Sequence, residues 1–389
     1  MAYQYVVLGS GRQGVAIAYD LAKNCEAKRV LLVDIDSDAT ERAVQRLRQL
    51  LPADAALFAA GVCDIADQRA VADVLRGADV AVSAVPYRFN VALTDAAISA
   101  GASFCDLGGN TAIVREQLSR DERAKAAGIS VAPDCGLAPG LGNILAAHGV
   151  AQLDKPREAH VRCGGLPEKP VGPLGYKLLF NFQGLINEYS GFGEFLRKGE
   201  RIDVPTLTEL EQIEFPEPIG ICEAAVTSGG TSTCPDSFRG TLDAYDYKTV
   251  RYPGHFAIVR AMFELGCFDE KIALSDGRTL EPKRVLRDLM EERLRFSDVR
   301  DITVLRATVI GERNGAAATI VYDLLDRHDE TTGFTAMERT TAFPTALVAH
   351  LQARRQIEPG ASPLERCVPL DCFMKELGGH DIRIEFRTR

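Results

Sequence analysis

Three glycines near the start of the chain have the spacing that a phosphate-binding turn requires. Gly9, Gly11 and Gly14 form a G-x-G-x-x-G pattern directly after an apolar run. In such a turn the first glycine makes the bend, the second lets the backbone approach a pyrophosphate, and the third lets the next helix pack closely. The N-terminus of the helix that follows the turn offers free backbone N–H groups to the phosphates, and we count Arg12 and Gln13 of the turn among the cofactor-binding residues. The pattern predicts a dinucleotide site.

An acidic residue follows at the place where the ribose of that dinucleotide would lie. Asp34 ends the second apolar run, Val30–Val33, about 20 residues after the last glycine. Its carboxylate can accept hydrogen bonds from a ribose 2′-OH and would repel a 2′-phosphate. We therefore expect NAD rather than NADP. Asp36 is either a second acid of the site or a residue at the N-terminus of the next helix.

Strands and helices alternate through the first 150 residues, which would bring these residues to one edge of a sheet. The expected strands are Tyr5–Leu8, Val30–Val33, Ala56–Gly61, Val80–Ala84, Ser103–Asp106 and Ile129–Pro133. The expected helices are Gly14–Lys23, Asp38–Leu50, Ala66–Leu75, Val91–Ala100 and Arg115–Ala127. This order predicts an α/β fold, a doubly wound parallel sheet of the Rossmann type, with ligands at the carboxyl ends of the strands. Residues 1–150 would form the NAD-binding domain.

Further cofactor-binding candidates stand after the third and fourth strands. Asp64 either lies near the adenine end of the dinucleotide or caps the next helix. Pro86 restricts Val85 to extended backbone, so this segment can lie along the cofactor. Asn90 follows in the same connection. We include all four residues in the predicted dinucleotide site.

Two more acids end the fifth and sixth strands. Asp106 and Asp134 are each followed by a glycine-rich turn. One interpretation is helix capping and turn chemistry. The other is that the two acids form a wall of the nicotinamide and substrate pocket, because adjacent parallel strands end at the same edge.

The chain changes character from about residue 155, where segments become longer and more typical of strands. The strand candidates are Glu158–Cys163, Arg251–Tyr252, Ile302–Glu312 and Ala316–Asp326, and the helix candidates are Phe256–Leu265 and Arg284–Arg293. The turn Arg313-Asn314-Gly315 predicts a hairpin. We expect an α+β domain over residues 151–336. A helix over Thr340–Gln352 would return the final segment, residues 337–389, to the first domain.

Composition narrows the function classes. A net charge of −9 argues against nucleic-acid and anionic-membrane partners. The ten cysteines form no C-x-x-C and no spacing typical of zinc, so we expect no metal and a reducing, cytoplasmic setting. The N-terminus runs directly into a strand, which leaves no room for a signal peptide. The uncharged segment Cys135–Leu153 predicts a loop and a buried helix rather than a membrane span.

Several motifs together resemble the saccharopine dehydrogenase family. They are Asp106–Asn110, Asp134–Gly140, Cys163–Pro167, Pro173–Lys177 and Thr249–His255. Within the family, Leu185–Tyr189 and Glu223–Thr231 are most similar to the L-lysine 6-dehydrogenase branch. Gly229-Gly230 departs from that branch, because an acidic residue is expected there.

The resemblance implies NAD-dependent oxidative deamination of the ε-amino group of L-lysine. The 6-semialdehyde formed would cyclise to a piperideine carboxylate, with release of ammonia. It also implies a second domain of the saccharopine reductase type, a homo-oligomer built through that domain, and a small amino-acid substrate.

Such chemistry needs a neutral amine nitrogen and a second proton transfer when water adds to the iminium. The candidate proton-transfer residues are His255, Lys177, Asp106 and Asp134. The candidate substrate-binding residues are Tyr176, Arg251, Tyr252, Thr231 and Glu223. His255 titrates nearest neutral pH, and Arg251 offers a bidentate fork for a carboxylate unless it belongs to an interior ion pair.

Two other functions are compatible with the sequence. A saccharopine-type or carboxylated-polyamine dehydrogenase would oxidise a secondary amine, and its site would need more cationic groups for the extra carboxylates. A non-catalytic NAD-binding sensor would use the same fold without turnover.

Overall fold

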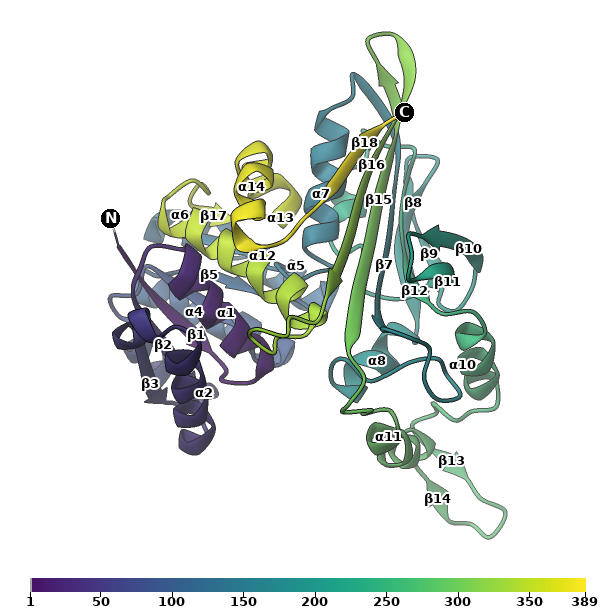
Figure 1. Cartoon of the computed structure of the whole chain (residues 1–389), viewed down its shortest axis with the longest axis horizontal. Coiled ribbons are helices and arrows are strands. Elements are labelled where there is room, and N and C mark those ends of the chain that lie inside the picture. The colour runs from purple at the N-terminus through teal and green to yellow at the C-terminus, as the bar shows by residue number, and fades with distance from the viewer. Residues whose placement is uncertain (1) are drawn as a thin grey trace.

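The computed structural model describes residues 2–389, which form a parallel sheet and a larger mixed sheet (Figure 1). The strands of the parallel sheet are β1 (Tyr3–Leu8), β2 (Ala27–Asp34), β3 (Phe58–Val62), β4 (Val80–Ser83), β5 (Ser103–Asp106), β6 (Ser130–Ala132) and β17 (Gly360–Ala361). Their order is β17-β6-β5-β4-β1-β2-β3, and every pairing is parallel. The strand order reverses direction between β1 and β4, so the doubly wound prediction is confirmed and this switch point is the expected place for a ligand.

The helices of this half follow the expected alternation, with one exception. They are α1 (Arg12–Asn24), α2 (Ser37–Leu50), α3 (Gln68–Leu75), α4 (Asn90–Ala100), α5 (Thr111–Leu118) and α6 (Asp121–Ala127), with short 3-10 turns η1 (Pro52–Leu57) and η2 (Tyr87–Phe89). The single helix expected over Arg115–Ala127 was wrong. Asn110 starts α5 early, because its side chain accepts the Ile113 N–H at 3.1 Å. Asp121 and Glu122 then favour a second N-terminus in the first turn of α6.

The second sheet is mixed and contains most of the remaining strands. They are β7 (Lys155–Pro167), β8 (Phe192–Arg197), β9 (Glu200–Pro205), β10 (Glu211–Phe215), β11 (Gly220–Val226), β12 (Ala244–Arg251), β15 (Asp301–Arg313), β16 (Ala316–Arg327) and β18 (Glu385–Thr388). Its main path runs β10-β11-β12-β7-β15-β16-β18, and only β12 and β7 pair in parallel. Asn314 and Gly315 have φ of 54° and 77° and form the predicted hairpin turn between β15 and β16.

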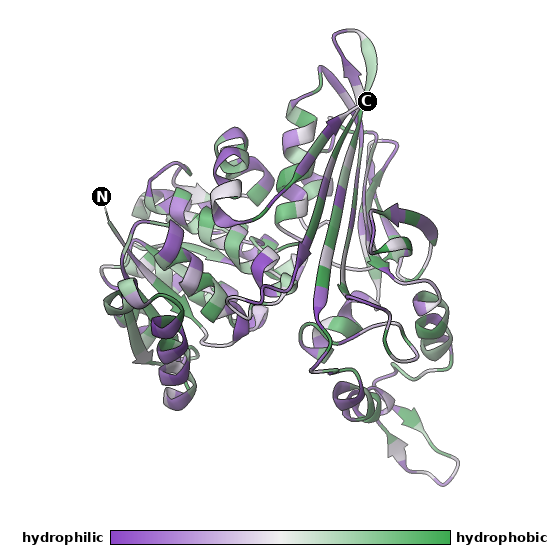
Figure 2. Ribbon diagram, in the orientation of Figure 1, coloured by the Kyte–Doolittle hydropathy of each residue, from purple (hydrophilic) through white to green (hydrophobic). Residues whose placement is uncertain are grey.

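The remaining elements, all after β6 along the chain, are helices, one 3-10 turn and one small strand pair. They are α7 (Leu141–Ala151), α8 (Phe182–Glu188), α9 (Cys234–Ser237), α10 (His255–Glu264), α11 (Pro282–Arg293), α12 (Ala336–Ala353), α13 (Leu364–Cys367) and α14 (Leu370–Leu377), with the 3-10 turn η3 (Gly378–His380) and the small pair β13 (Ile272–Ala273) and β14 (Thr279–Leu280). The α2 and α11 ribbons are largely hydrophilic in Figure 2, and α11 has no buried residue. Among residues 2–389, no helix has the length and hydropathy needed to cross a membrane.

The C-terminal segment connects the two sheets. Helix α12 lies beside α1, as Figure 1 shows, and Gln352 on α12 donates to the carbonyls of Phe104 and Ser130 at 3.0 and 3.1 Å. The last strand, β18, instead pairs with β16 of the mixed sheet. Helix α7 packs mainly against β7 and β15 of the mixed sheet. Helix α7 and strand β18, which we expected to belong to the first domain, thus both contact the mixed sheet. The exact domain limits stay a prediction.

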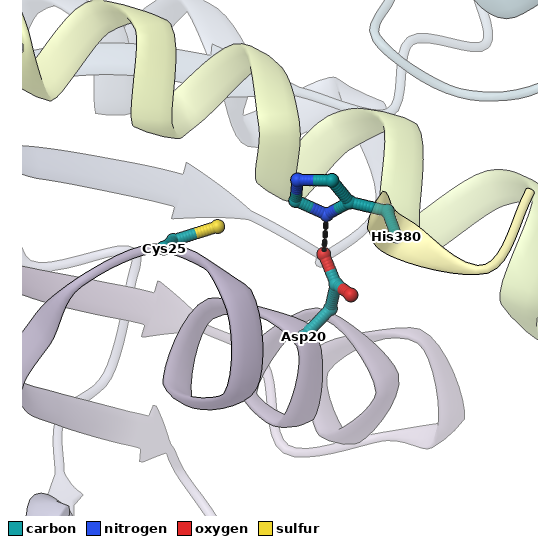
Figure 3. Close-up of side chains that lie close together, drawn as sticks. All are labelled: Asp20, Cys25 and His380. Atoms are coloured by element: carbon teal, nitrogen blue, oxygen red, sulfur yellow. Dashed lines mark hydrogen bonds and ion pairs between the residues drawn. The ribbon is translucent and has the colours of Figure 1, made fainter. Parts of the chain in front are cut away.

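Three residues of types that bind metals lie together where the tail meets α1 (Figure 3). Asp20, Cys25 and His380 are buried, and their ligand atoms lie within 4.8 Å of one another. Each atom already has a protein partner. His380 Nδ1 lies 2.5 Å from one oxygen of Asp20, Asn24 donates to the other at 2.6 Å, and the Cys25 thiol faces the Ala346 carbonyl. The cluster therefore fastens η3 onto α1.

Candidate active site

The glycine turn leaves room in front of the first helix. Gly9 has a φ of +104°, and a Cβ on Gly14 would lie 1.9 Å from the Gly9 carbonyl oxygen, so both positions require glycine. A Cβ on Gly11 would meet nothing within 4 Å. Gly11 is also the N-cap of α1, whose first N–H groups receive no side-chain cap. The open space and the free donors fit a pyrophosphate group.

The side chains of the next two residues do not face this space. Arg12 Nε donates to Glu338 at 2.5 Å, and Gln13 reaches toward the Met337 carbonyl. Both partners lie at the start of α12. Arg12 and Gln13 therefore contribute backbone N–H groups to the predicted site, while their side chains hold α12 against α1.

Asp34 occupies the position expected for a ribose-binding acid. One of its oxygens accepts from the Ser10 N–H at 2.8 Å and from the Ser10 hydroxyl at 3.1 Å. Burial opposes ionisation, but these hydrogen bonds and others from the backbone lower the pKa of Asp34 below its usual value. Asp36, in contrast, is the N-cap of α2 and accepts from Ala39 N–H at 3.0 Å. The two acids thus differ in role.

Two apolar side chains beside Asp34 were not anticipated. Ile35 and Val62, at the carboxyl ends of β2 and β3, are 65% and 62% exposed. Exposed apolar side chains at this edge are suited to contact an adenine ring, and a search for apolar residues directly after the strands would have found them. Asp64, two residues beyond Val62, accepts from the Ala66 N–H at 2.9 Å and forms a turn.

The fourth strand leads into a tightly packed connection. Val85 lies against the glycine turn, since its Cγ1 is 3.0 Å from the position of a Cβ on Gly9. Pro86 is the N-cap of η2. Asn90 is buried and accepts from the Ser83 hydroxyl at 2.8 Å, so its side chain supports this connection from behind.

The two acids of the glycine-rich turns come together at the carboxyl edge. Asp106 is fully buried, and its oxygens accept from Gly108 N–H and Gln117 Nε2, both at 2.7 Å. Asp134 lies beside it, with the left-handed φ of 63°. Burial, followed by the charge of Asp106, raises the pKa of Asp134 to about 7. One oxygen of Asp134 accepts from the Ser232 hydroxyl, and the other is buried without a partner among the described residues.

In the second domain, His255 belongs to a buried polar network. Its Nδ1 lies 2.9 Å from the Leu174 carbonyl and must donate, so Nε2 accepts from the Tyr189 hydroxyl at 2.8 Å. Burial and then the charge of Arg251 lower the pKa of His255 to about 3. The imidazole is neutral and both nitrogens are engaged. These contacts favour a positioning role over direct proton exchange with a substrate.

Arg251 lies in the same network, and its positive charge is balanced by a carboxylate inside the protein. Its guanidinium donates to the Glu188 carboxylate at 3.2 Å and to the Val250 carbonyl at 2.9 Å, and it stacks 4.8 Å from the ring centre of Tyr176. The interior ion pair considered from the sequence is therefore present. Glu188 was missed as a site residue, although it lies within a stretch that carried the family resemblance.

The other second-domain candidates have diverse contacts. Lys177 donates to the Val299 carbonyl. Burial lowers the pKa of Lys177; the charge of Arg12 lowers it further, and the charge of Asp301 opposes the change. Glu223 caps α10 by accepting from the Phe256 N–H at 2.8 Å. Tyr252 donates to the Pro167 carbonyl at 3.0 Å, and Thr231 is buried with its carbonyl accepting from Asn143. Lys177 is the member of this group that lies near the cofactor turn, through Arg12.

The fold and the glycine turn define a protein with a dinucleotide-binding domain of the Rossmann type. The family model described as "Saccharopine dehydrogenase NADP binding domain" matches residues 5–131, and "Saccharopine dehydrogenase C-terminal domain" matches residues 136–382. The chain belongs to the saccharopine dehydrogenase family, which confirms the resemblance seen in the sequence.

Two curated relatives, each about a quarter identical in sequence, agree with this assignment. The saccharopine dehydrogenase [NADP(+), L-glutamate-forming] of Schizosaccharomyces pombe is 24% identical over 217 residues, which cover 53% of this chain and 47% of that protein. The Saccharomyces cerevisiae enzyme of the same name is 25% identical over 219 residues, covering 52% and 47%. The match thus spans about half the length of these relatives. The apo structure of histidine-tagged saccharopine dehydrogenase (L-Glu forming) from S. cerevisiae has the same fold, with a TM-score of 0.80 at 19% identity over 100% of both chains.

Proposed function

We propose that the protein is an L-lysine 6-dehydrogenase that uses NAD. It would oxidise the carbon that carries the ε-amino group and release ammonia and the 6-semialdehyde, which cyclises to piperideine-6-carboxylate. The observation that carries this proposal is that two arginines among the site candidates are already paired with carboxylates inside the protein. Arg12 is paired with Glu338, and Arg251 is paired with Glu188. Lys177 hydrogen-bonds to a neutral carbonyl instead, so it can serve a substrate with one carboxylate.

The choice of NAD rests on Asp34. Hydrogen bonds from Ser10 favour its ionised form at the end of β2. A carboxylate at this place accepts from both ribose hydroxyls and repels a 2′-phosphate.

Asp134 is the strongest candidate for the proton acceptor. Its pKa of about 7 gives it appreciable amounts of both protonation forms near neutral pH, and its Oδ1 makes no hydrogen bond to any residue that the structure describes. It would take the proton of the substrate ammonium and leave the neutral amine. A nicotinamide dinucleotide held at the glycine turn would supply the hydride acceptor when the adjacent carbon is oxidised to the iminium. Asp134 would release its first proton to solvent and then accept a proton from the water that adds to the iminium carbon. That proton would pass to the nitrogen, so that ammonia leaves as the aldehyde forms. Asp106 would hold the Asp134 turn, since it accepts from the Asp134 N–H at 3.3 Å.

A second candidate is a dehydrogenase that acts on a secondary amine such as saccharopine or a carboxylated polyamine. The names of the relatives, which specify saccharopine and NADP(+), favour it. Its additional carboxylates would need cations beyond Lys177. Arg88, which stacks on Phe89 in η2, could supply one, as could Arg12 or Arg251 after release from their present partners.

We also propose a cytoplasmic homo-oligomer. Ten cysteines without a disulfide among residues 2–389 are compatible with a reducing compartment.

The test is a panel of amines assayed with NAD and NADP side by side. Reduction of NAD with L-lysine, and slower or no reduction with saccharopine, supports the proposal. Preferential use of saccharopine with NADP would establish the second candidate. Tight NAD binding without turnover of any amine would instead indicate the sensor function.

A further inference from the structure

The Glu188–Arg251 pair is asymmetric in its exposure. Glu188 ends α8, and its Oε2 accepts from Arg251 Nη2 at 3.2 Å. The Arg251 side chain is 3% exposed, whereas that of Glu188 is 29% exposed. The positive member is therefore enclosed, while the negative member reaches solvent.

Arg251 has several partners, but one of the two carboxylate oxygens of Glu188 accepts no hydrogen bond from the described residues. The guanidinium also contacts the Val250 carbonyl, the Tyr189 hydroxyl and the face of the Tyr176 ring. Among residues 2–389, Glu188 Oε1 accepts no hydrogen bond, and the bond from Arg251 goes to Oε2. A carboxylate with one oxygen committed and one free is suited to a cationic ligand.

Glu188 is tied to the place where the two domains meet. Its carbonyl accepts from the Ser228 N–H at 2.9 Å, and the same loop continues to Ser232, which donates to Asp134. Glu188 also lies close to Cys163 on the central strand β7: burial and then the Glu188 charge raise the pKa of that thiol to about 12. One loop thus connects the backbone of Glu188 to the proposed proton acceptor.

We infer that Glu188 binds the α-ammonium group of the amino-acid substrate. This inference rests on the proposed function. L-Lysine carries two amino groups, and the one that is not oxidised remains a cation that must be held away from Asp134. Glu188 supplies the opposite charge. Burial raises the pKa of Glu188, and Arg251 opposes that rise and holds the carboxylate in place. The ligand class is a primary ammonium on an amino acid.

The first test compares two substrates in Glu188→Gln. Glutamine keeps the size and an acceptor for Arg251 but removes the charge. L-Lysine has the α-ammonium, and 6-aminohexanoate lacks it. We expect KM for L-lysine to rise tenfold or more with little change in kcat, while KM for 6-aminohexanoate stays within twofold. Equal changes for both substrates would overturn the inference. Glu188→Asp, which keeps the charge, should restore part of the preference for L-lysine.

Glu312→Gln is the matched control, because Glu312 is 24% exposed and paired with Lys155 and Arg157 at the hairpin end of β15. It should leave both KM values unchanged. A second measurement separates this inference from the proposed function. Calorimetry with the NAD-loaded protein compares L-norleucine, which has the α-ammonium but cannot be oxidised at C6, with hexanoate. Preference for norleucine in the wild type and its loss in Glu188→Gln supports the ammonium site even without turnover; absence of any preference in the wild type refutes it.

Discussion

The Ser232 hydroxyl, on the loop after β11, donates a hydrogen bond to the Asp134 carboxylate at the end of β6. This contact joins the mixed sheet to the carboxyl edge of the parallel sheet. Asp134 also fills the space that a side chain at Gly108 would need, since a Cβ there would lie 1.7 Å from Asp134 Oδ1. A side chain of the second domain therefore lowers the pKa of an acid that belongs to the first domain.

Replacing Ser232 by alanine should shift the pH dependence of catalysis. The hydroxyl stabilises the charged form of Asp134, so its loss raises the pKa of Asp134 further above about 7. The acidic limb of the kcat/KM profile should move to higher pH by roughly one unit, which corresponds to about 1.4 kcal/mol. Ser190→Ala removes a hydroxyl bonded only to the Ile186 carbonyl and serves as control. An unmoved limb in Ser232→Ala would argue against Asp134 as the proton acceptor.

Alanine at two glycines of the turn should separate folding from cofactor binding. Gly11→Ala places a methyl group in the open space before α1, so the melting temperature should stay near that of the wild type while NAD affinity falls at least tenfold. Gly14→Ala forces the methyl onto the Gly9 carbonyl, so it should lower the free energy of unfolding by roughly 2 kcal/mol or more. Thermal melts and fluorescence titration with NADH measure the two effects. Retained NADH affinity in a folded Gly11→Ala variant would place the pyrophosphate elsewhere.

Asp34→Ala should relax the cofactor preference. Removal of the carboxylate eliminates repulsion of a 2′-phosphate, so the ratio of kcat/KM for NAD to that for NADP should fall by at least tenfold. Asp36→Ala is the matched control, because Asp36 caps α2. It should cost about 1 kcal/mol of stability and leave the ratio unchanged. If Asp36→Ala shifted the ratio and Asp34→Ala did not, the assignment of the two acids would be reversed.

His255 should make the protein sensitive to acid. Its pKa is about 3 in the folded protein and about 6.5 when unfolded, so the unfolded chain binds a proton first as the pH falls. Its contribution to stability is present above pH 6.5 and is lost towards pH 3, at up to roughly 1.4 kcal/mol per pH unit. His255→Gln should therefore flatten the decline in unfolding free energy, measured by urea denaturation at pH 7.5, 6 and 5. Parallel declines in the variant and the wild type would show that His255 is not the group responsible.

The elements that depend on local pattern could be predicted, and contacts between distant residues could not. The glycine turn, Asp34 and the strand edges follow from spacing along one stretch of chain. Whether Asp34 or Asp36 faces the ribose depends on which one Ser10 reaches. The Arg251–Glu188 pair joins residues from two separate segments, so spacing alone could not distinguish a carboxylate-binding arginine from an interior ion pair. His255 likewise appeared to be a titrating residue until its burial against Leu174 and Tyr189 was visible.

The most direct test of the central claim follows the nitrogen that leaves the substrate. The purified protein is incubated with NAD and L-lysine labelled with ¹⁵N at the ε position only, and the released ammonia and the cyclised product are analysed by mass spectrometry. The account predicts ¹⁵N-ammonia in amounts equal to the NADH formed and an unlabelled piperideine carboxylate. Unlabelled ammonia, or NADH formed only when saccharopine replaces L-lysine, would contradict it.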